Sequence, residues 1–196
     1  MFMKVYKTLM VKRSFIHLAF LLLIVSFFVS KVYAYENLYM LPYQNKEALK
    51  ELVQSIDYAK KDIKVAIYSF TYRPLINALK KASARGVKVH IIFDSGNLND
   101  RGHPKDYSAL GDLAKYRNID VCTLKGLKDR KHNYYGIMHQ KLIIIDDKLL
   151  ALGSANWSKN AFELSYETLL FTDFPSSVKT ASHFYKDMFS RCKLYR

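Results

Sequence analysis

The chain has 196 residues, enough for one domain with a hydrophobic core, and a formal net charge of +14 at pH 7. Its two cysteines, Cys122 and Cys192, exclude a cysteine-rich metal cluster; in an exported chain they could form one disulfide, with two unpaired buried thiols as the alternative. Residues 1–34 hold five basic residues and no acidic one, so nine of the excess positive charges remain on residues 35–196. This excess favours a polyanionic partner, first nucleic acid and second an anionic membrane surface, over a merely basic solvated surface.

Residues 1–34 have the layout of a secretory signal peptide. Basic residues precede an apolar run over residues 15–29, and Val32-Tyr33-Ala34 suits a cleavage site after Ala34. An uncleaved N-terminal membrane anchor is the alternative, although the run is shorter than the ~20 residues that span a bilayer comfortably. We therefore expect residues 35–196 to form a single exported domain, periplasmic or associated with the inner or outer membrane.

The first half of this domain alternates between helix and strand patterns. The apolar residues after Asn45, a possible helix cap, follow the spacing of one helix face. Residues 63–70 alternate as a strand, and residues 87–93 form an apolar strand typical of burial on both faces. Between them, Pro74 and Gly86 mark the start and the end of a helix. This strand–helix–strand unit predicts a right-handed parallel crossover.

The second half contains shorter elements and two polar loops, at residues 97–106 and 125–135. No second domain and no internal repeat is visible. Together with the first half, the pattern predicts an α/β fold in which helices sandwich a mixed β-sheet. The expected elements are a short helix at residues 107–117, strands at 119–123, 137–145, 149–152 and 166–172, and a closing helix at 175–191.

The most informative segment places a histidine and a lysine two positions apart in the strand expected at residues 137–145. Successive strand residues alternate faces, so His139 and Lys141 should point to the same side, about 6–7 Å apart. An imidazole beside a fixed cation suits chemistry on an anion such as a phosphate ester. Asp146 lies an odd number of positions after His139 and should face the other way. We expect Asp146 to end the strand and anchor the next turn.

The pattern His-x-Lys-x4-Asp, followed by Gly-Ser-x-Asn at residues 153–156, resembles the signature of the phospholipase D superfamily. The resemblance extends upstream through residues 63–71 and 86–94 and downstream to Ser165-Tyr166-Glu167, and so covers most of the chain after about residue 38. Within the superfamily, the chain is similar to the small single-motif endonucleases of the Nuc and Zucchini type, and in particular to the NucT-type nucleases of Helicobacter and its relatives. The resemblance implies a phospholipase D-like fold.

The same resemblance implies a role for each residue of the site. His139 would attack phosphorus and form a phosphohistidine, while Lys141 and the amide of Asn156 would hold the non-bridging oxygens. Glu167 would hold the proton on the second imidazole nitrogen, with Glu163 as the local alternative. The remaining residues, which would support the site, are Ser154, Asp146 and Gly153.

Neither a metal ion nor a cofactor is expected. The nearest acidic residues, Asp94, Asp100 and Asp106, are scattered along a loop and do not form the carboxylate cluster of a two-metal site. A second catalytic histidine is also absent from the pattern, because His103-Pro104-Lys105 lies in a Gly/Pro loop with no Gly-Ser-x-Asn after it. Since the two-motif relatives use two histidines in one site, the resemblance implies a homodimer with the active site on its axis.

A basic and aromatic segment precedes the motif and fits a groove that tracks a phosphate backbone and stacks bases, a solvated loop being the alternative. Its residues are Lys125, Lys128, Arg130, Lys131, Tyr134 and Tyr135. By contrast, we expect the aromatic residues Tyr68, Phe70, Tyr72 and Trp157 to lie in the core or at a dimer contact.

We expect an exported, metal-independent endonuclease that acts on DNA, with RNA as the second candidate substrate, and preferably on single strands. The alternative is a phospholipase D or cardiolipin-type lipid hydrolase with the same chemistry. Such an enzyme would need an exposed apolar ridge for lipid access, and no such stretch is evident after residue 35. A DNA-binding module with an inactive site is disfavoured by the intact motif.

Overall fold

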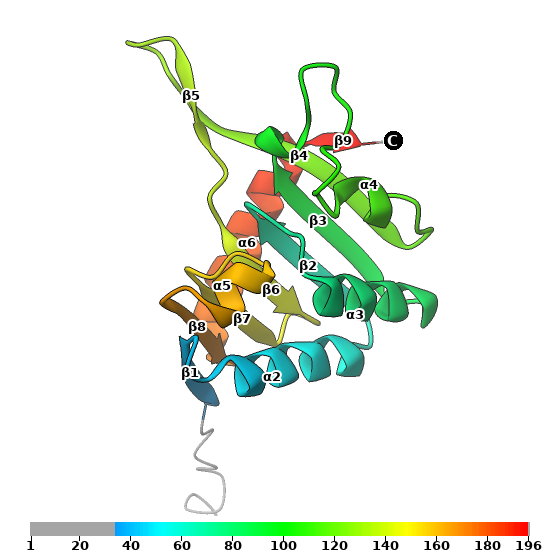
Figure 1. The fold of residues 1–196 in the computed structure, drawn as a ribbon, viewed down its shortest axis with the longest axis vertical. Helices are drawn as coiled ribbons and strands as arrows, with labels where there is room; N and C mark the ends of the chain where they lie inside the picture. The colour runs from blue at the N-terminus through cyan, green and yellow to red at the C-terminus, as the bar shows by residue number, and fades with distance from the viewer. Residues whose placement is uncertain (1–33, 196) are drawn as a thin grey trace, which may run out of the picture. The chain divides into compact units, whose positions relative to one another are not determined.

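Nine β-strands pair into one mixed sheet, and helices cover both of its faces (Figure 1). This computed structural model describes residues 34–195, so the expected signal peptide or anchor lies outside the described residues except for Ala34. The strands are β1 (Glu36–Leu41), β2 (Asp62–Ile67), β3 (Lys88–Asp94), β4 (Ile119–Asp129), β5 (Tyr134–Ile137), β6 (Lys141–Ile145), β7 (Leu149–Gly153), β8 (Glu167–Thr172) and β9 (Lys193–Tyr195). The helices are α2 (Asn45–Tyr58), α3 (Arg73–Ala84), the 3₁₀ turn η1 (Ser95–Asn97), α4 (Leu110–Leu113), α5 (Lys159–Glu163) and α6 (Pro175–Arg191).

The strands follow the order β1-β8-β7-β6-β2-β3-β4-β5, with β9 paired to β4. Strands β2, β3 and β4 run parallel, whereas the other pairs are antiparallel. Helix α3 connects β2 to β3, which confirms the expected crossover. Pro74 lies in its first turn, and Gly86, with a φ of +91°, follows its end in a conformation that favours glycine.

Each face of the sheet has its own hydrophobic core. The larger core lies under α2 and α3 and includes Leu52, Leu79 and the inward residues of the central strands. The smaller core lies under α6, where Val178 and Tyr185 pack against Ala66 and Ile144. The mixed sheet sandwiched by helices is therefore confirmed.

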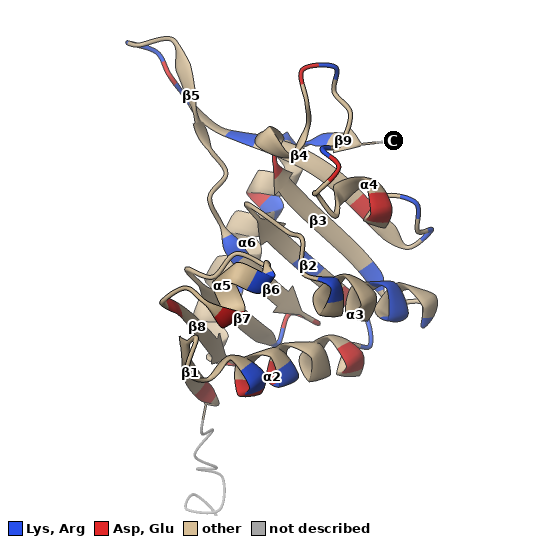
Figure 2. Ribbon diagram, viewed as in Figure 1, with Lys and Arg blue, Asp and Glu red and all other residues tan. Residues whose placement is uncertain are grey.

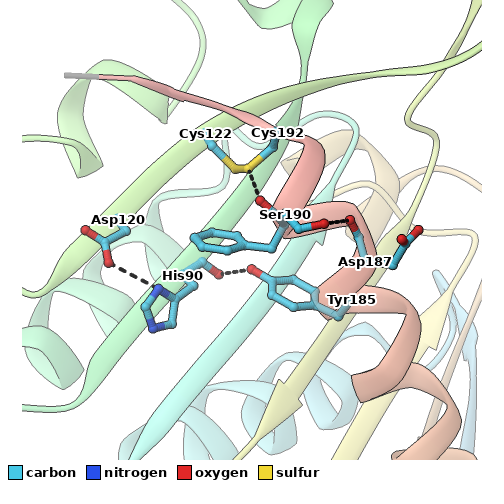
Figure 3. Close-up of a disulfide and its surroundings, with 8 residues drawn as sticks. His90, Asp120, Cys122, Tyr185, Asp187, Ser190 and Cys192 are labelled. Atoms are coloured by element: carbon cyan, nitrogen blue, oxygen red, sulfur yellow. Dashed lines mark hydrogen bonds and ion pairs between the residues drawn. A yellow bond between two sulfur atoms is a disulfide. The ribbon is translucent and has the colours of Figure 1, made fainter.

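A disulfide fastens the C-terminal end of α6 to the sheet (Figure 3). Cys122 lies on β4 and Cys192 directly after α6, so the paired alternative is the one observed. About two turns earlier on α6, the Tyr185 hydroxyl donates a 2.7 Å hydrogen bond to the carbonyl oxygen of His90 on β3. Among residues 34–195, no helix combines the length and the apolar character needed to cross a membrane.

Several local expectations were wrong. Strand β1 was not expected, and the loop expected at residues 125–135 is instead the end of β4 paired with β5 in a hairpin. The helix expected at residues 107–117 is reduced to α4. Asn45 is the first residue of α2 and does not cap it; Gln44 occupies the cap position without a side-chain cap hydrogen bond.

Candidate active site

His139 and Lys141 meet at the start of β6, but only Lys141 belongs to the strand. The expectation of one strand over residues 137–145 was wrong: β5 ends at Ile137 and β6 begins at Lys141. His139 therefore lies in a short connection and is exposed, and its ring centre is 4.5 Å from that of Tyr68. The connection is held by the backbone N–H of Tyr68, which donates a 2.9 Å hydrogen bond to the carbonyl oxygen of Gln140.

Lys141 carries a buried charge that is not neutralised at short range. The residue is 6% exposed, and its Nζ donates a 3.0 Å hydrogen bond to the carbonyl oxygen of His139. Burial lowers the pKa of Lys141, and the charge of Glu167 partly opposes that effect. Among residues 34–195, no carboxylate oxygen lies within 4.0 Å of this ammonium group. Its charge is therefore available to a bound anion.

The Gly-Ser pair of the motif lies at the end of β7 and contacts the start of β8. A side chain at Gly153 would place its Cβ 2.0 Å from the carbonyl oxygen of Thr168, so this position requires glycine. The Ser154 backbone N–H donates to the same oxygen at 3.1 Å, and the Ser154 hydroxyl donates to a carboxylate oxygen of Glu167. Ser154 thus fixes the position of the Glu167 carboxylate at the first residue of β8.

Asn156 presents a polar group without a protein partner. Its Oδ1 atom is buried and makes no hydrogen bond within the described residues. An amide with an unused end can turn a donor toward a bound anion. The next residue, Trp157, fixes this segment: its backbone N–H donates to the carbonyl oxygen of Ser69 at 3.0 Å, and its ring packs edge-on against that of Phe70, with ring centres 4.8 Å apart.

The two candidate carboxylates have different surroundings. Glu163 accepts a 3.1 Å hydrogen bond from the Tyr72 hydroxyl. Glu167 lies near Lys141 and bonds to Ser154. No hydrogen bond joins either ring nitrogen of His139 to another group of residues 34–195. The role of Glu167 in holding the imidazole proton therefore stays a prediction.

Asp146 lies at the other end of β6 and holds a neighbouring loop. It has a φ of +55°, and its carboxylate accepts hydrogen bonds of 2.9, 2.7 and 3.1 Å from the backbone N–H groups of Lys60, Lys61 and Asp62. Burial alone would raise the pKa of Asp146, but these three donors and the charge of Lys148 outweigh it, so the pKa is lowered. Asp146 thus anchors the connection between α2 and β2.

Two further residues support His139 and were not identified from the sequence. Asp94, which is 4% exposed, accepts a 2.9 Å hydrogen bond from the N–H of Met138, the residue before His139. Asn97, also buried, donates a 2.8 Å hydrogen bond to the carbonyl oxygen of Tyr68. The sequence could have pointed to Asp94 through its position at the carboxyl end of a buried parallel strand, where the ligand-binding sites of α/β folds commonly lie.

The basic and aromatic segment forms the hairpin of β4 and β5, which projects from the sheet (Figure 1) and carries basic residues along its length (Figure 2). The ammonium groups of Lys125 and Lys128 lie 5.2 and 5.9 Å from the ring centre of Tyr135. Arg130 and Lys131 lie at its turn, and Tyr134 is exposed on β5. A groove of about 760 Å³ beside the hairpin adds Arg191 and Lys193, two basic residues that the sequence had not indicated.

Exposed apolar residues lie on β1 and before β8, so the expectation of no such stretch after residue 35 was wrong. On β1, Leu38 and Met40 are each at least half exposed, and Tyr43 follows them. Leu164 and Tyr166, before β8, are also strongly exposed. Phe70 and Trp157, in contrast, are buried as expected, while Tyr68 lies at the site itself.

Within residues 34–195, no three His, Cys, Asp or Glu side chains are grouped in a way that could hold a metal ion. Contacts and charge link His139, Lys141, Ser154 and Glu167 at the candidate site, with Tyr68 and Asp94 in support, and Asn156 lies two residues after Ser154 in the chain.

Comparisons with known proteins identify the family. The family model described as "Cardiolipin synthase, PLD-like domain" matches residues 52–192. The solved structure of NucT from Helicobacter pylori is 46% identical, with a TM-score of 0.78, over 83% of this chain and 99% of that one. Nuc from Salmonella typhimurium, a phospholipase D family member, is 25% identical, with a TM-score of 0.65, over the same shares of the two chains.

The mouse mitochondrial cardiolipin hydrolase is 26% identical over 69% of this chain and 55% of its own length. The chain spans between 27% and 61% of the length of the first curated relatives that it matches. The family match covers most of the described domain, and it includes the motif residues His139, Lys141, Ser154 and Asn156. The chain therefore belongs to the phospholipase D superfamily, in the family of cardiolipin synthase-type, phospholipase D-like domains.

Proposed function

We propose that this protein is a phosphodiesterase, and more specifically an exported endonuclease that cleaves nucleic-acid phosphodiester bonds without a metal ion. The observation that carries the proposal is the exposed imidazole of His139 beside the buried, unneutralised ammonium group of Lys141. A nucleophile next to a fixed cation is what attack on a phosphate diester requires. The likeness to Nuc and NucT along almost their whole length supports a nuclease.

In the proposed mechanism, a neutral ring nitrogen of His139 attacks phosphorus, and the bond from phosphorus to the leaving oxygen breaks. The imidazolium of a second histidine gives its proton to that oxygen. His139 is then covalently bound to phosphorus as a phosphohistidine. Water then attacks phosphorus, the second imidazole takes its proton, and the bond from phosphorus to His139 breaks. Lys141 and Asn156 stabilise the charge on the non-bridging oxygens, and Glu167 holds the proton on the other nitrogen of His139.

The second imidazole comes, in this proposal, from the His139 of a second copy across a two-fold axis. Within residues 34–195, His103 is the other histidine in a His-x-Lys pattern, and it lies in an exposed loop outside the site. The exposure of His139 supports the proposal, because an exposed ring is accessible to a partner subunit.

The basic hairpin supports nucleic acid as the substrate, DNA first and RNA as a possibility. Exposed tyrosines and lysines on a narrow, projecting ribbon suit a flexible backbone with accessible bases, which favours single strands. Export is supported by the Cys122–Cys192 disulfide, since disulfides persist in oxidising compartments. Association with a membrane would come from the N-terminal segment.

The test offers the purified protein single-stranded DNA, duplex DNA, RNA and cardiolipin vesicles in parallel, with excess chelator. We expect cleavage of nucleic acid to survive the chelator, and added Mg²⁺ to inhibit by competing for backbone phosphates. His139→Ala should abolish turnover but keep affinity, whereas Lys141→Ala and Asn156→Ala should each lower the rate by roughly 10²–10³-fold. Strict dependence on a divalent ion would contradict the phosphohistidine mechanism.

A lipid hydrolase with the same chemistry is the second candidate. The exposed apolar residues on β1 and before β8 favour it, because they could contact a lipid surface next to the site. The likeness to a cardiolipin hydrolase agrees with it. Release of phosphatidic acid from cardiolipin vesicles, with no cleavage of nucleic acid, would replace the first proposal by this one.

A further inference from the structure

Two tyrosines that the proposed mechanism does not use lie together on the surface. Tyr43, after β1, is 77% exposed, and Tyr166, before β8, is 81% exposed. They are 123 positions apart in the sequence, yet their ring centres are 6.0 Å apart with an interplanar angle of 49°. Because large aromatic side chains gain stability by burial, two that meet outside the core point to a role in binding.

The pair borders a small cavity that reaches the candidate active site. The cavity has a volume of about 170 Å³, and its exposed lining is almost entirely apolar. Tyr43, Tyr166 and Met40 line it together with Ser154 and Glu167. A ligand in this cavity would therefore contact the hydrogen-bonded pair Ser154 and Glu167, and Glu167 is the carboxylate whose charge acts on Lys141.

The chemistry of the lining decides which part of a substrate fits. No lysine or arginine lines the cavity, so it does not suit a phosphate. Its volume is below the ~300 Å³ of pockets that enclose whole small ligands, so it suits one ring system and not a lipid acyl chain. Apolar walls with tyrosine rings match the flat face of a nucleobase, which stacks on aromatic side chains with little preference for sequence.

We propose that Tyr43 and Tyr166 form a subsite for the nucleobase next to the scissile phosphate. The inference rests on the proposed nuclease function and deepens it. It divides the binding surface into two parts: the hairpin of β4 and β5 holds the phosphate backbone through its lysines, and the tyrosine pair holds one base. A base must be unpaired to enter such a cavity, so the subsite would also produce a preference for single strands.

The experiment compares two single-stranded oligonucleotides, one normal and one whose residues all lack the base (tetrahydrofuran residues). Full-length wild type is compared with Tyr43→Ala, Tyr166→Ala, Tyr166→Phe and the control Tyr58→Ala, an equally exposed tyrosine at the end of α2. We expect Tyr43→Ala and Tyr166→Ala each to raise KM for the normal strand by about tenfold, the loss of a stacked base, with kcat little changed. Tyr58→Ala should behave as wild type, whereas Tyr166→Phe, which keeps the stacking ring and loses only the hydroxyl, should raise KM much less than Tyr166→Ala does.

On the strand without bases, wild type and the alanine variants should have the same kcat/KM, because no base is present to stack. A second readout uses an oligonucleotide with 2-aminopurine, whose fluorescence falls on stacking, bound to His139→Ala protein that cannot cleave it. Adding Tyr166→Ala to that protein should restore the fluorescence. Thermal unfolding of each variant checks that the fold is kept.

Unchanged KM for the normal strand in both alanine variants, with unchanged 2-aminopurine fluorescence, would overturn the subsite while leaving the nuclease intact. Failure of wild type to cut either strand would instead overturn the proposed function itself. If the alanine variants lose activity on cardiolipin vesicles but not on DNA, the cavity belongs to a lipid site and the base subsite is wrong.

Discussion

Lys141 is placed to lose its proton more easily than an ordinary lysine. Its ammonium group is buried at the start of β6, where burial lowers its pKa below the usual 10.5 and the charge of Glu167 only partly restores it. The protonated form is the one that can hold a phosphate oxygen. Activity that depends on Lys141 should therefore fall on the alkaline side at a lower pH than a solvent-exposed lysine would produce.

This predicts a pH dependence that one substitution should change. In wild type, kcat/KM should decline as pH rises through the lowered pKa of Lys141. Lys141→Arg should have a lower maximum, because the guanidinium has a different shape, but no such decline, because it stays protonated. Steady-state rates between pH 7 and 11 measure this, with Lys148→Arg, at an exposed position, as the control. An alkaline decline that is the same in Lys141→Arg would assign the titration to another group.

At the residue scale, the sequence predicted the candidate reacting groups but not the residues that hold them in place. The spacing of His139, Lys141 and Asn156 is local, so it is visible in one dimension. Asp94 acts on Met138 from 44 positions away, and Tyr43 meets Tyr166 from 123 positions away. Such contacts depend on which strand ends become neighbours in the sheet, and periodicity alone does not determine that order.

At the scale of elements, Asp146 connects β6 to the start of β2. Its carboxylate accepts three backbone hydrogen bonds, and its pKa is lowered as a result. A carboxyl whose pKa is lower in the folded state than in the unfolded state stabilises the fold above its unfolded pKa, near 3.9. That contribution is lost as pH falls through the folded pKa.

Asp146→Asn should therefore destabilise the protein at neutral pH, by about 1–3 kcal/mol, because a neutral amide oxygen replaces a charged acceptor of three bonds. The difference from wild type should shrink as the pH falls through the lowered pKa of Asp146, because the folded protein then protonates that carboxylate as well. Urea unfolding at pH 7 and at low pH measures both quantities. Asp100→Asn, in an exposed loop, serves as the control. A difference that is independent of pH would mean that the carboxylate charge does not matter.

The elements that the sequence failed to predict have few buried residues or none. Every residue of β5 is exposed, so the hairpin has no inward-facing alternation to detect. Strand β1 lies at the sheet edge and has only two buried residues, Tyr39 and Leu41. The central strands β2, β3 and β6, in contrast, are almost fully buried and apolar, and were recognised.

The hairpin gives a prediction that separates binding from chemistry. Replacing Lys125 and Lys128 with alanine should weaken binding of single-stranded DNA and reduce the salt dependence of log Kd by about 0.7 per lost phosphate contact. The rate at saturating DNA should change little. Binding titrations from low to moderate salt test this, with Lys46→Ala and Lys50→Ala on α2 as the matched control. An unchanged salt slope would exclude the hairpin from the backbone contact.

For the whole molecule, the proposed chemistry requires more groups than one chain offers. Attack by His139 needs an acid on the opposite side of the phosphorus, and no second histidine lies at the site among residues 34–195. Water, with a pKa near 15.7, is a far weaker proton donor than an imidazolium near 6.5. Two copies of His139 facing each other across a two-fold axis would supply both groups, and both Lys141 side chains would then converge on one phosphate.

Mixing wild type with His139→Ala subunits tests this directly. After complete exchange of equal amounts, about a quarter of the dimers hold two His139 copies, so activity per total protein should fall to about a quarter of that of pure wild type. If each chain carries its own complete site, the value stays at about half. Differently tagged subunits allow the mixed dimer to be purified and exchange to be verified. The control is exchange with Tyr58→Ala subunits, which should leave activity unchanged. A purified mixed dimer with half the activity of wild type would show that each subunit works alone.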